Sequence, residues 1–184
     1  KIFILLMTVG ILCGCQGTTN ENSQKIGVIL PLTGDLSFLG NFMRNSMLLN
    51  AKGDDVQFIF EDCGGESKQA VLAVNKLVNI DKVSAIVSSV SYLSEAINPV
   101  LEAQGIPHFI LSFSPRLSKE KNVIQPFVSS MQEAEMFVKY IEENNISSVA
   151  FLRHQEPDAT YAYDNYTKLV LDSMNVSIVD VVFN

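Results

Sequence analysis

Apolar residues follow two alternating patterns along most of the chain. Short apolar runs indicate buried strands, and apolar residues spaced three and four apart indicate helices with one buried face. Strands are expected over 25–30, 56–61, 83–87, 108–111, 123–128, 149–152 and 177–183. Helices are expected over 39–51, 68–80, 93–101, 134–141 and 162–174. Pro99 should kink the third helix or weaken its second turn.

This alternation predicts parallel β-α-β units with right-handed crossovers, and therefore an α/β fold with a doubly wound sheet. In such sheets, ligands gather at the carboxyl ends of the strands. The loops at those ends are expected at 32–38, 62–66, 88–91 and 112–116. A second series of elements begins near 128–131, which predicts a first lobe over 25–128 and the start of a second lobe over 129–184.

The start of the chain has the pattern of a bacterial export signal. Residues 1–12 carry one basic residue and an apolar run too short to cross a bilayer, which needs about 20 apolar residues. A transmembrane helix and a buried N-terminal helix are the alternatives. Residues 12–15, Leu-Cys-Gly-Cys, resemble the bacterial lipobox. That resemblance implies a lipoprotein signal peptide over 1–15, a lipid anchor on Cys15 and a flexible polar tether over 16–24.

Two further features of the chain follow from this interpretation. The protein is expected to be exported and lipid-anchored to the bacterial cell membrane, facing the periplasm or the exterior. Cys63 would have no disulfide partner, because Cys13 leaves with the signal peptide and Cys15 is lipidated, so a free or buried thiol is expected.

The chain begins at Lys1 and stops inside an expected strand, and we therefore expect it to be part of a longer protein.

Composition and motifs argue against several classes of function. The net charge of −7 and the pI of about 4.8 argue against a nucleic-acid partner, because no basic stripe is available to neutralise phosphates. The sequence has no Gly-rich phosphate loop, paired-cysteine zinc motif or His-Glu-x-x-His string, so we expect no cofactor, no metal and no enzyme. The two histidines, His108 and His154, fit a strand residue and a solvated loop residue.

Several short strings resemble one family in their order and spacing. They are Lys-Ile-Gly-Val-Ile-Leu-Pro-Leu-Thr-Gly at 25–34, Lys-Gln-Ala at 68–70, Asn-Pro at 98–99, Gly-Ile-Pro at 105–107 and Ser-Pro-Arg-Leu-Ser at 114–118. From residue 25 to its end, the chain resembles the type I periplasmic solute-binding proteins, the leucine/isoleucine/valine-binding group. The resemblance implies two Rossmann-like lobes that close on a ligand. A complete member is about twice this length.

The resemblance also implies ligand contacts in the first lobe. A Ser at the start of the helix after the third strand receives the ligand carboxylate in amino-acid-binding relatives, and Ser91 has that place. A helix N-terminus offers free N–H groups there, although a plain N-cap serine is the alternative. In the loop after the fourth strand, Phe113 replaces the family's Thr, and Ser112 or Ser114 is then the source of a hydroxyl. This departure leaves amino-acid specificity open.

Further contacts are implied in the first loop and in the second lobe. Phe38 and Leu39 match the lid over the ligand side chain, with core packing as the alternative. Tyr161 matches a family Tyr at a helix start, with packing again as the alternative. The family's common Arg and Asp correspond to Gln125 and Ser130 here, which removes charged partners for a zwitterion.

The resemblance therefore favours a substrate-binding lipoprotein of an ABC transporter. It would bind an amino acid of the branched-chain type, or a similar small polar solute, and present it to an ABC permease in the membrane. The alternative is the same fold acting as a ligand sensor or as the activator of an envelope enzyme, with a protein partner.

Overall fold

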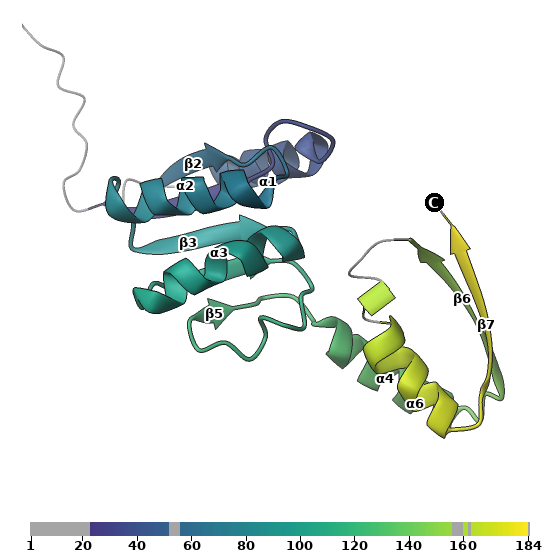
Figure 1. The fold of residues 1–184 in the computed structure, drawn as a ribbon. Helices are drawn as coiled ribbons and strands as arrows, with labels where there is room; N and C mark the ends of the chain where they lie inside the picture. Colours follow the sequence, from purple (N-terminus) through teal and green to yellow (C-terminus); the bar gives the residue numbers. More distant parts are fainter. Residues whose placement is uncertain (1–22, 52–55, 156–159, 162, 184) are drawn as a thin grey trace, which may run out of the picture.

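The computed structural model describes residues 23–51, 56–155, 160–161 and 163–183 (Figure 1). The expected signal peptide, the expected lipidation site at Cys15 and most of the expected tether lie outside these residues. Gln24, which we placed in the tether, is the first residue of the first strand. Among the described residues, no helix combines the length and the apolar character needed to cross a membrane.

Five parallel strands form the first sheet. They are β1 (Gln24–Leu30), β2 (Val56–Asp62), β3 (Ala85–Ser89), β4 (His108–Leu111) and β5 (Val123–Ile124), in the order β2-β1-β3-β4-β5. The expected parallel α/β sheet is thereby confirmed. Because all strands run in one direction, their carboxyl ends meet at a single edge. Only the expected strand at 123–128 is much shorter, because Pro126 has no N–H to give to the ladder.

Three helices accompany this sheet: α1 (Ser37–Asn50), α2 (Ser67–Asn79) and α3 (Ser91–Ala103). Helices α2 and α3 lie on the same face in Figure 1 and enclose the main hydrophobic core, which includes Ile29, Leu77, Ile86 and Leu101. Pro99 lies inside α3 without ending it. Together, β1–β5 and α1–α3 are called the first unit below.

The second unit comprises α4 (Ser130–Glu143), β6 (Ser148–His154), the π-helical turn η1 (Tyr163–Thr167), α6 (Lys168–Ser173) and β7 (Ser177–Phe183). Strands β6 and β7 are parallel, and α4 and α6 lie on one side of them (Figure 1). Ser129 and Gln132 form a capping box that fixes the start of α4. The expected helix at 162–174 is divided into η1 and α6. The lobe boundary between 128 and 129 stays a prediction.

A buried polar network joins α3 to the sheet. His108 Nε2 lies 2.7 Å from Ser88 Oγ, and its Nδ1 lies 3.0 Å from Asn98 Oδ1. Since an amide oxygen can only accept, Nδ1 carries the ring proton and Nε2 accepts from the serine. All three side chains are buried. Burial lowers the pKa of His108 from 6.5 to about 4, so the ring is neutral in the folded protein.

This network predicts a loss of stability on mild acidification. His108 binds a proton near pH 6.5 in the unfolded protein but only near pH 4 in the folded protein. Its contribution to the free energy of unfolding is therefore complete above pH 6.5 and is lost as the pH falls from 6.5 to 4. We expect the free energy of unfolding to drop by about 2 kcal/mol between pH 7 and pH 5, measured by urea denaturation. His108→Gln should remove this part of the pH dependence, whereas replacing the exposed His154 by Gln should retain it.

Gly40 allows α1 to approach the end of β1. A Cβ atom at this position would clash with the carbonyl oxygen of Pro31, which belongs to the backbone and cannot rotate away. Helix α1 therefore packs close to the residue that begins the first loop. This contact is what brings the start of α1 to the carboxyl edge of the sheet.

Gly40→Ala should destabilise the protein although alanine is the better helix former. Propensity alone favours alanine by about 1 kcal/mol, and the forced shift of α1 should outweigh it, for a net loss of about 1–3 kcal/mol. Thermal and urea unfolding measure the effect. Asn45→Ala, at an exposed position of the same helix, is the matched control and should be neutral or slightly stabilising. A stabilised Gly40→Ala variant would contradict the close approach.

Candidate functional site

The candidate site lies at the carboxyl edge of the first sheet. Ser89 pairs with Leu111 across β3 and β4, so the loops that begin with Val90 and Ser112 leave the sheet side by side. Adjacent strands are about 4.8 Å apart. The structure therefore brings Ser91 and the segment 112–114 to neighbouring positions, as we expected.

Helix α3 begins immediately after β3, with Ser91 as its first residue. The N-cap position belongs to Val90, so the plain N-cap alternative for Ser91 is wrong. Val90 has φ 66° and ψ 122°, an unusual backbone for a β-branched residue. Such strain is common at functional sites, and here it turns the chain sharply so that the first N–H groups of α3 meet the sheet edge.

Two buried serine hydroxyls occupy this edge without a partner. Among the residues that the structure describes, Ser89 Oγ and Ser112 Oγ have no hydrogen-bond partner. Both residues are buried, and a buried hydroxyl that makes no hydrogen bond costs about 1–3 kcal/mol. The neighbouring Ser88 differs, because its hydroxyl is engaged by His108.

Gln125 and Ser130, which the resemblance matched to a family Arg and Asp, hold the loop after β4. Gln125 Nε2 donates to the carbonyl oxygen of Ser112 at 2.8 Å, and Ser130 Oγ donates to that of Phe113 at 3.2 Å. The Phe113 ring lies 5.6 Å from that of Phe127, and the two residues are 53% and 45% exposed. Gln125 and Ser130 thus anchor the loop, and the loop presents an aromatic surface.

Ser114 is already engaged by α3. Its hydroxyl donates to Glu95 Oε1 at 2.7 Å, and Arg116 Nη1 donates to Glu95 Oε2 at 2.8 Å. The Arg116 guanidinium lies 4.1 Å from the centre of the Tyr161 ring. Hydrogen bonding to Glu95 raises the pKa of Arg116 above its ordinary value. Two predicted ligand contacts, Ser114 and Tyr161, are thus joined to one ion pair.

Asp62 fixes the first and second loops of the site. Its carboxylate accepts from Leu32 N at 2.8 Å, Thr33 N at 3.2 Å, Thr33 Oγ1 at 2.6 Å and Gly64 N at 2.8 Å. Burial alone raises the pKa of Asp62, but the hydrogen bonds outweigh it and the pKa lies below its ordinary value. Nearby, Phe38 is 73% exposed at the start of α1 and Leu39 is half-buried.

We expect Asp62→Ala to loosen the first loop. The N–H groups of Leu32 and Gly64 lose their acceptor, so their amide exchange with deuterium should accelerate, and stability should fall by about 1 kcal/mol. Asp62→Asn should be intermediate because it keeps one oxygen acceptor. The exposed Asp35 lies in the same loop, and Asp35→Asn is the matched control. Unchanged exchange at Leu32 and Gly64 would show that Asp62 does not hold the loop.

A serine, a histidine and an asparagine that resemble a nucleophile, its base and an orienting group do occur in the chain. Ser88, His108 and Asn98 have that connectivity. Ser88 and His108 lie in the sheet and Asn98 in α3, all three side chains are buried, and their hydrogen bonds join the helix to the sheet. Within the described ranges, no group of three or more His, Cys, Asp or Glu residues is placed to hold a metal ion.

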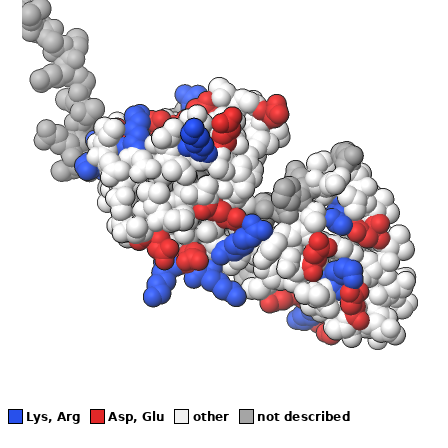
Figure 2. Space-filling model, in the orientation of Figure 1, with Lys and Arg blue, Asp and Glu red and all other residues white. Residues whose placement is uncertain are grey.

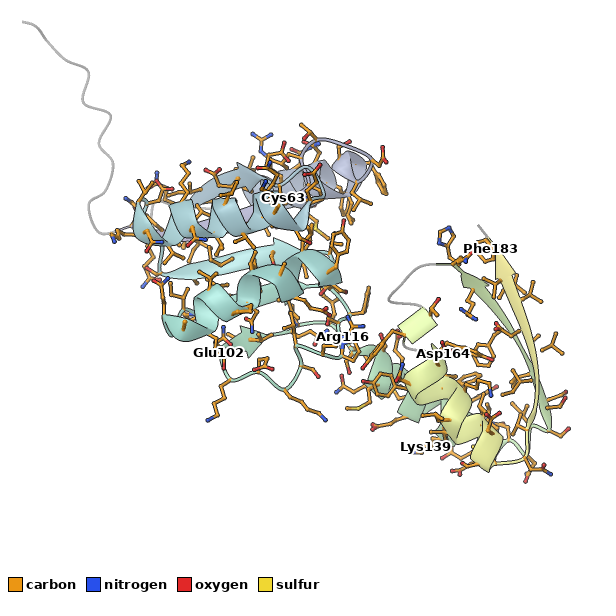
Figure 3. The ribbon with its side chains drawn as sticks, viewed as in Figure 1. Cys63, Glu102, Arg116, Lys139, Asp164 and Phe183 are labelled. Carbon is orange, nitrogen blue, oxygen red and sulfur yellow. The ribbon has the colours of Figure 1, made fainter. Side chains whose placement is uncertain are left out.

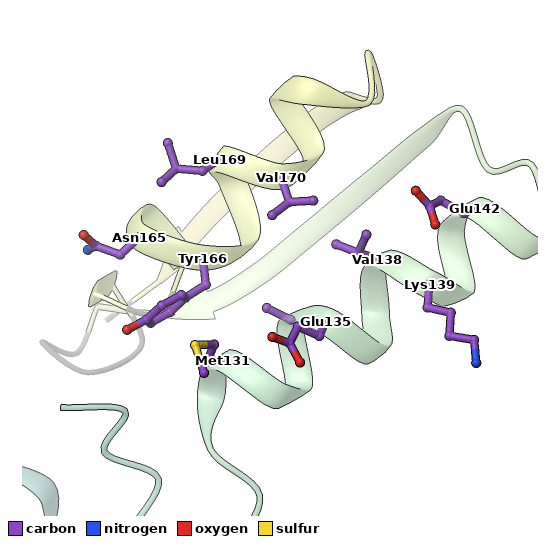
Figure 4. A pocket seen from close by; sticks show the side chains of 10 residues that line it. Met131, Glu135, Val138, Lys139, Glu142, Asn165, Tyr166, Leu169 and Val170 are labelled. Carbon is purple, nitrogen blue, oxygen red and sulfur yellow. The ribbon is translucent and has the colours of Figure 1, made fainter. Parts of the chain in front are cut away.

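Two cavities among the described residues lie in the second unit, away from this edge. Figure 2 shows acidic and basic side chains mixed on the visible face. A groove of about 450 Å³ lies between α4 and α6 and is lined mainly by apolar groups, including Val138, Leu169 and Val170 (Figure 4). None of the predicted ligand contacts lines this groove.

The fold agrees with the comparison to known families. A family model described as periplasmic binding protein matches residues 23–183. The chain therefore belongs to the type I periplasmic binding proteins, as the sequence predicted. A comparison with curated proteins gives no match.

Solved structures show the same fold. A solute-binding protein of an ABC transporter from Rhodopseudomonas palustris BisB5, in complex with 3,4-dihydroxybenzoic acid, has a TM-score of 0.73 at 18% identity, covering 88% of this chain and 47% of its own. A leucine-binding protein from Thermotoga maritima MSB8 has a TM-score of 0.68 at 24% identity, with 88% and 49% covered. A solute-binding protein of an ABC transporter from R. palustris HaA2, in complex with p-hydroxybenzoic acid, has a TM-score of 0.69 at 16% identity, covering 87% of this chain and 46% of its own. The chain spans about half the length of these structures.

Sequence reasoning missed four residues of the site. Asp62, Ser89, Glu95 and Arg116 were not among the predicted contacts, although Asp62 and Ser89 end their strands and Arg116 belongs to a string that suggested the family. The position of a strand end is therefore a usable signal for the first two. Glu95 had no comparable signal, because its role depends on the packing of α3 beside the loop after β4.

Proposed function

We propose that the protein is an extracytoplasmic solute-binding protein that captures a small carboxylate-bearing solute at the carboxyl edge of the first sheet. The observation that carries this proposal is the two buried, unpartnered hydroxyls of Ser89 and Ser112, at the carboxyl ends of the adjacent strands β3 and β4. A helix N-terminus attracts anions through its free N–H groups and its dipole. Hydroxyl donors next to it complete a site for a carboxylate.

The aromatic surface of the loop after β4 favours a solute with a planar apolar body. Phe113 and Phe127 are exposed next to the proposed carboxylate site, and Gln125 and Ser130 hold the loop without adding charge. Two structural neighbours are described in complex with hydroxybenzoic acids, and another is a leucine-binding protein. We therefore rank aromatic acids above branched-chain amino acids as ligands.

The ligand is proposed to act by closing two lobes. Contacts with both lobes favour the closed form through differential affinity, and the closed form would be recognised by an ABC permease. Lipidation of Cys15 would hold the protein at the bacterial cell membrane, within reach of that permease. Membership of the periplasmic binding proteins supports an extracytoplasmic location.

Binding by the whole protein, measured by calorimetry, tests the proposal. The panel contains p-hydroxybenzoate, 3,4-dihydroxybenzoate, leucine and uncharged p-hydroxybenzamide. We expect an aromatic carboxylate to bind best and the amide to bind poorly. Ser91→Ala and Ser112→Ala should each weaken binding of that carboxylate about 10-fold, the value of one hydrogen bond to a charged group.

Ser84→Ala is the matched control, because Ser84 is exposed at the opposite end of β3 and should leave affinity unchanged. Wild-type affinity in both site variants would reject the proposed carboxylate site. No binding by any member of the panel would instead favour the sensor or enzyme-activator alternative, in which the partner is a protein.

A further inference from the structure

We propose that Arg116 is a positioning residue that draws the two units together through Tyr161 and so sets how readily the cleft closes. This inference rests on the proposed solute-binding function but concerns a contact that exists without a ligand. In it, Tyr161 strengthens ligand binding by receiving the guanidinium of Arg116, rather than by touching the solute.

The Arg116 side chain is held by its own unit. Glu95, on α3, accepts from Arg116 Nη1 with one carboxylate oxygen and from Ser114 Oγ with the other. Glu95 is the more buried member of the ion pair, with side-chain exposures of 21% for Glu95 and 47% for Arg116. The carboxylate thus anchors the guanidinium at a fixed place while leaving its flat face open. Arg116 lies at the junction of the two units in Figure 3.

Tyr161, in the second unit, contacts the flat face of the Arg116 guanidinium. The guanidinium carbon is 4.1 Å from the ring centre, within the range of a cation–π contact. The Tyr161 ring is supported in turn by Tyr166 of η1, at 6.1 Å between ring centres and an angle of 74°. A continuous series of contacts therefore runs from α3 through Glu95, Arg116 and Tyr161 to the second unit.

A contact of this kind changes affinity by the same factor for every ligand. The contact stabilises the closed arrangement, in which the two units meet, and has no effect on the separated arrangement. Cation–π contacts at partly exposed positions change an equilibrium by roughly 2- to 30-fold. The ring face of Tyr161 that receives the guanidinium is unavailable for stacking on a solute, which separates this role from direct recognition.

The experiment measures closure and binding in the whole protein. A fluorophore pair, one in each unit, reports the closed fraction without ligand, and calorimetry gives affinities for p-hydroxybenzoate, 3,4-dihydroxybenzoate and leucine. We expect Arg116→Ala to lower the closed fraction and to weaken each measurable affinity by a common factor of about 3–10, with the order of ligands unchanged. Tyr161→Leu should act alike, and the double variant should resemble either single one.

Two controls protect this interpretation. Tyr161→Phe keeps the ring and should retain closure, and Lys119→Ala removes an exposed charge from the same segment and should have no effect. The proposal is overturned by an altered ligand order, by tighter binding in Arg116→Ala, by additive effects in the double variant, or by an unchanged closed fraction. If no ligand in the panel binds, the solute proposal fails, and the closed fraction of the variants still decides the role of Arg116.

Discussion

The candidate site depends on the parallel hydrogen-bond ladder that joins β1, β3 and β4. In its register, Ser88 pairs with Ile29 and Ile110, which turns its hydroxyl to His108 beneath α3. A slip of one residue would exchange the faces of Ser88 and Ser89. The buried histidine would then lose its partner and the edge would lose a hydroxyl. The interior network and the binding edge are consequently specified by one alignment of strands.

Most of the fold could be predicted because the spacing of apolar residues within each short segment identifies it as a strand or a helix. Buried strands and one-faced helices leave distinct repeats, and the order of these repeats determines the parallel sheet. The failures have local or packing causes. Pro126 shortens β5 by removing a ladder donor, and the helix expected at 162–174 is divided by the π-turn at Tyr163–Thr167, which no apolar repeat reveals.

The candidate site could be predicted in its location but only partly in its chemistry. Ser91 and Ser112 could be found because strand ends and helix starts are visible in the sequence. The bonds of Glu95 to Ser114 and Arg116 could not, since they join segments about 20 residues apart whose contact depends on three-dimensional packing. Likewise, Gln125 and Ser130 read as lost charges, whereas the structure uses them to hold two consecutive carbonyl groups of one loop.

Val90 links the binding edge to the interior in a different way. Its left-handed backbone is unfavourable on its own, and its side chain packs against the hydrophobic core between the sheet and helices α2 and α3. The strained corner between β3 and α3 is therefore kept in place by packing of the Val90 side chain against the core. When that packing slackens, the first turn of α3 is free to rotate away from the sheet. The position of the first N–H groups of α3 at the candidate site thus depends on how well the hydrophobic core behind them is packed.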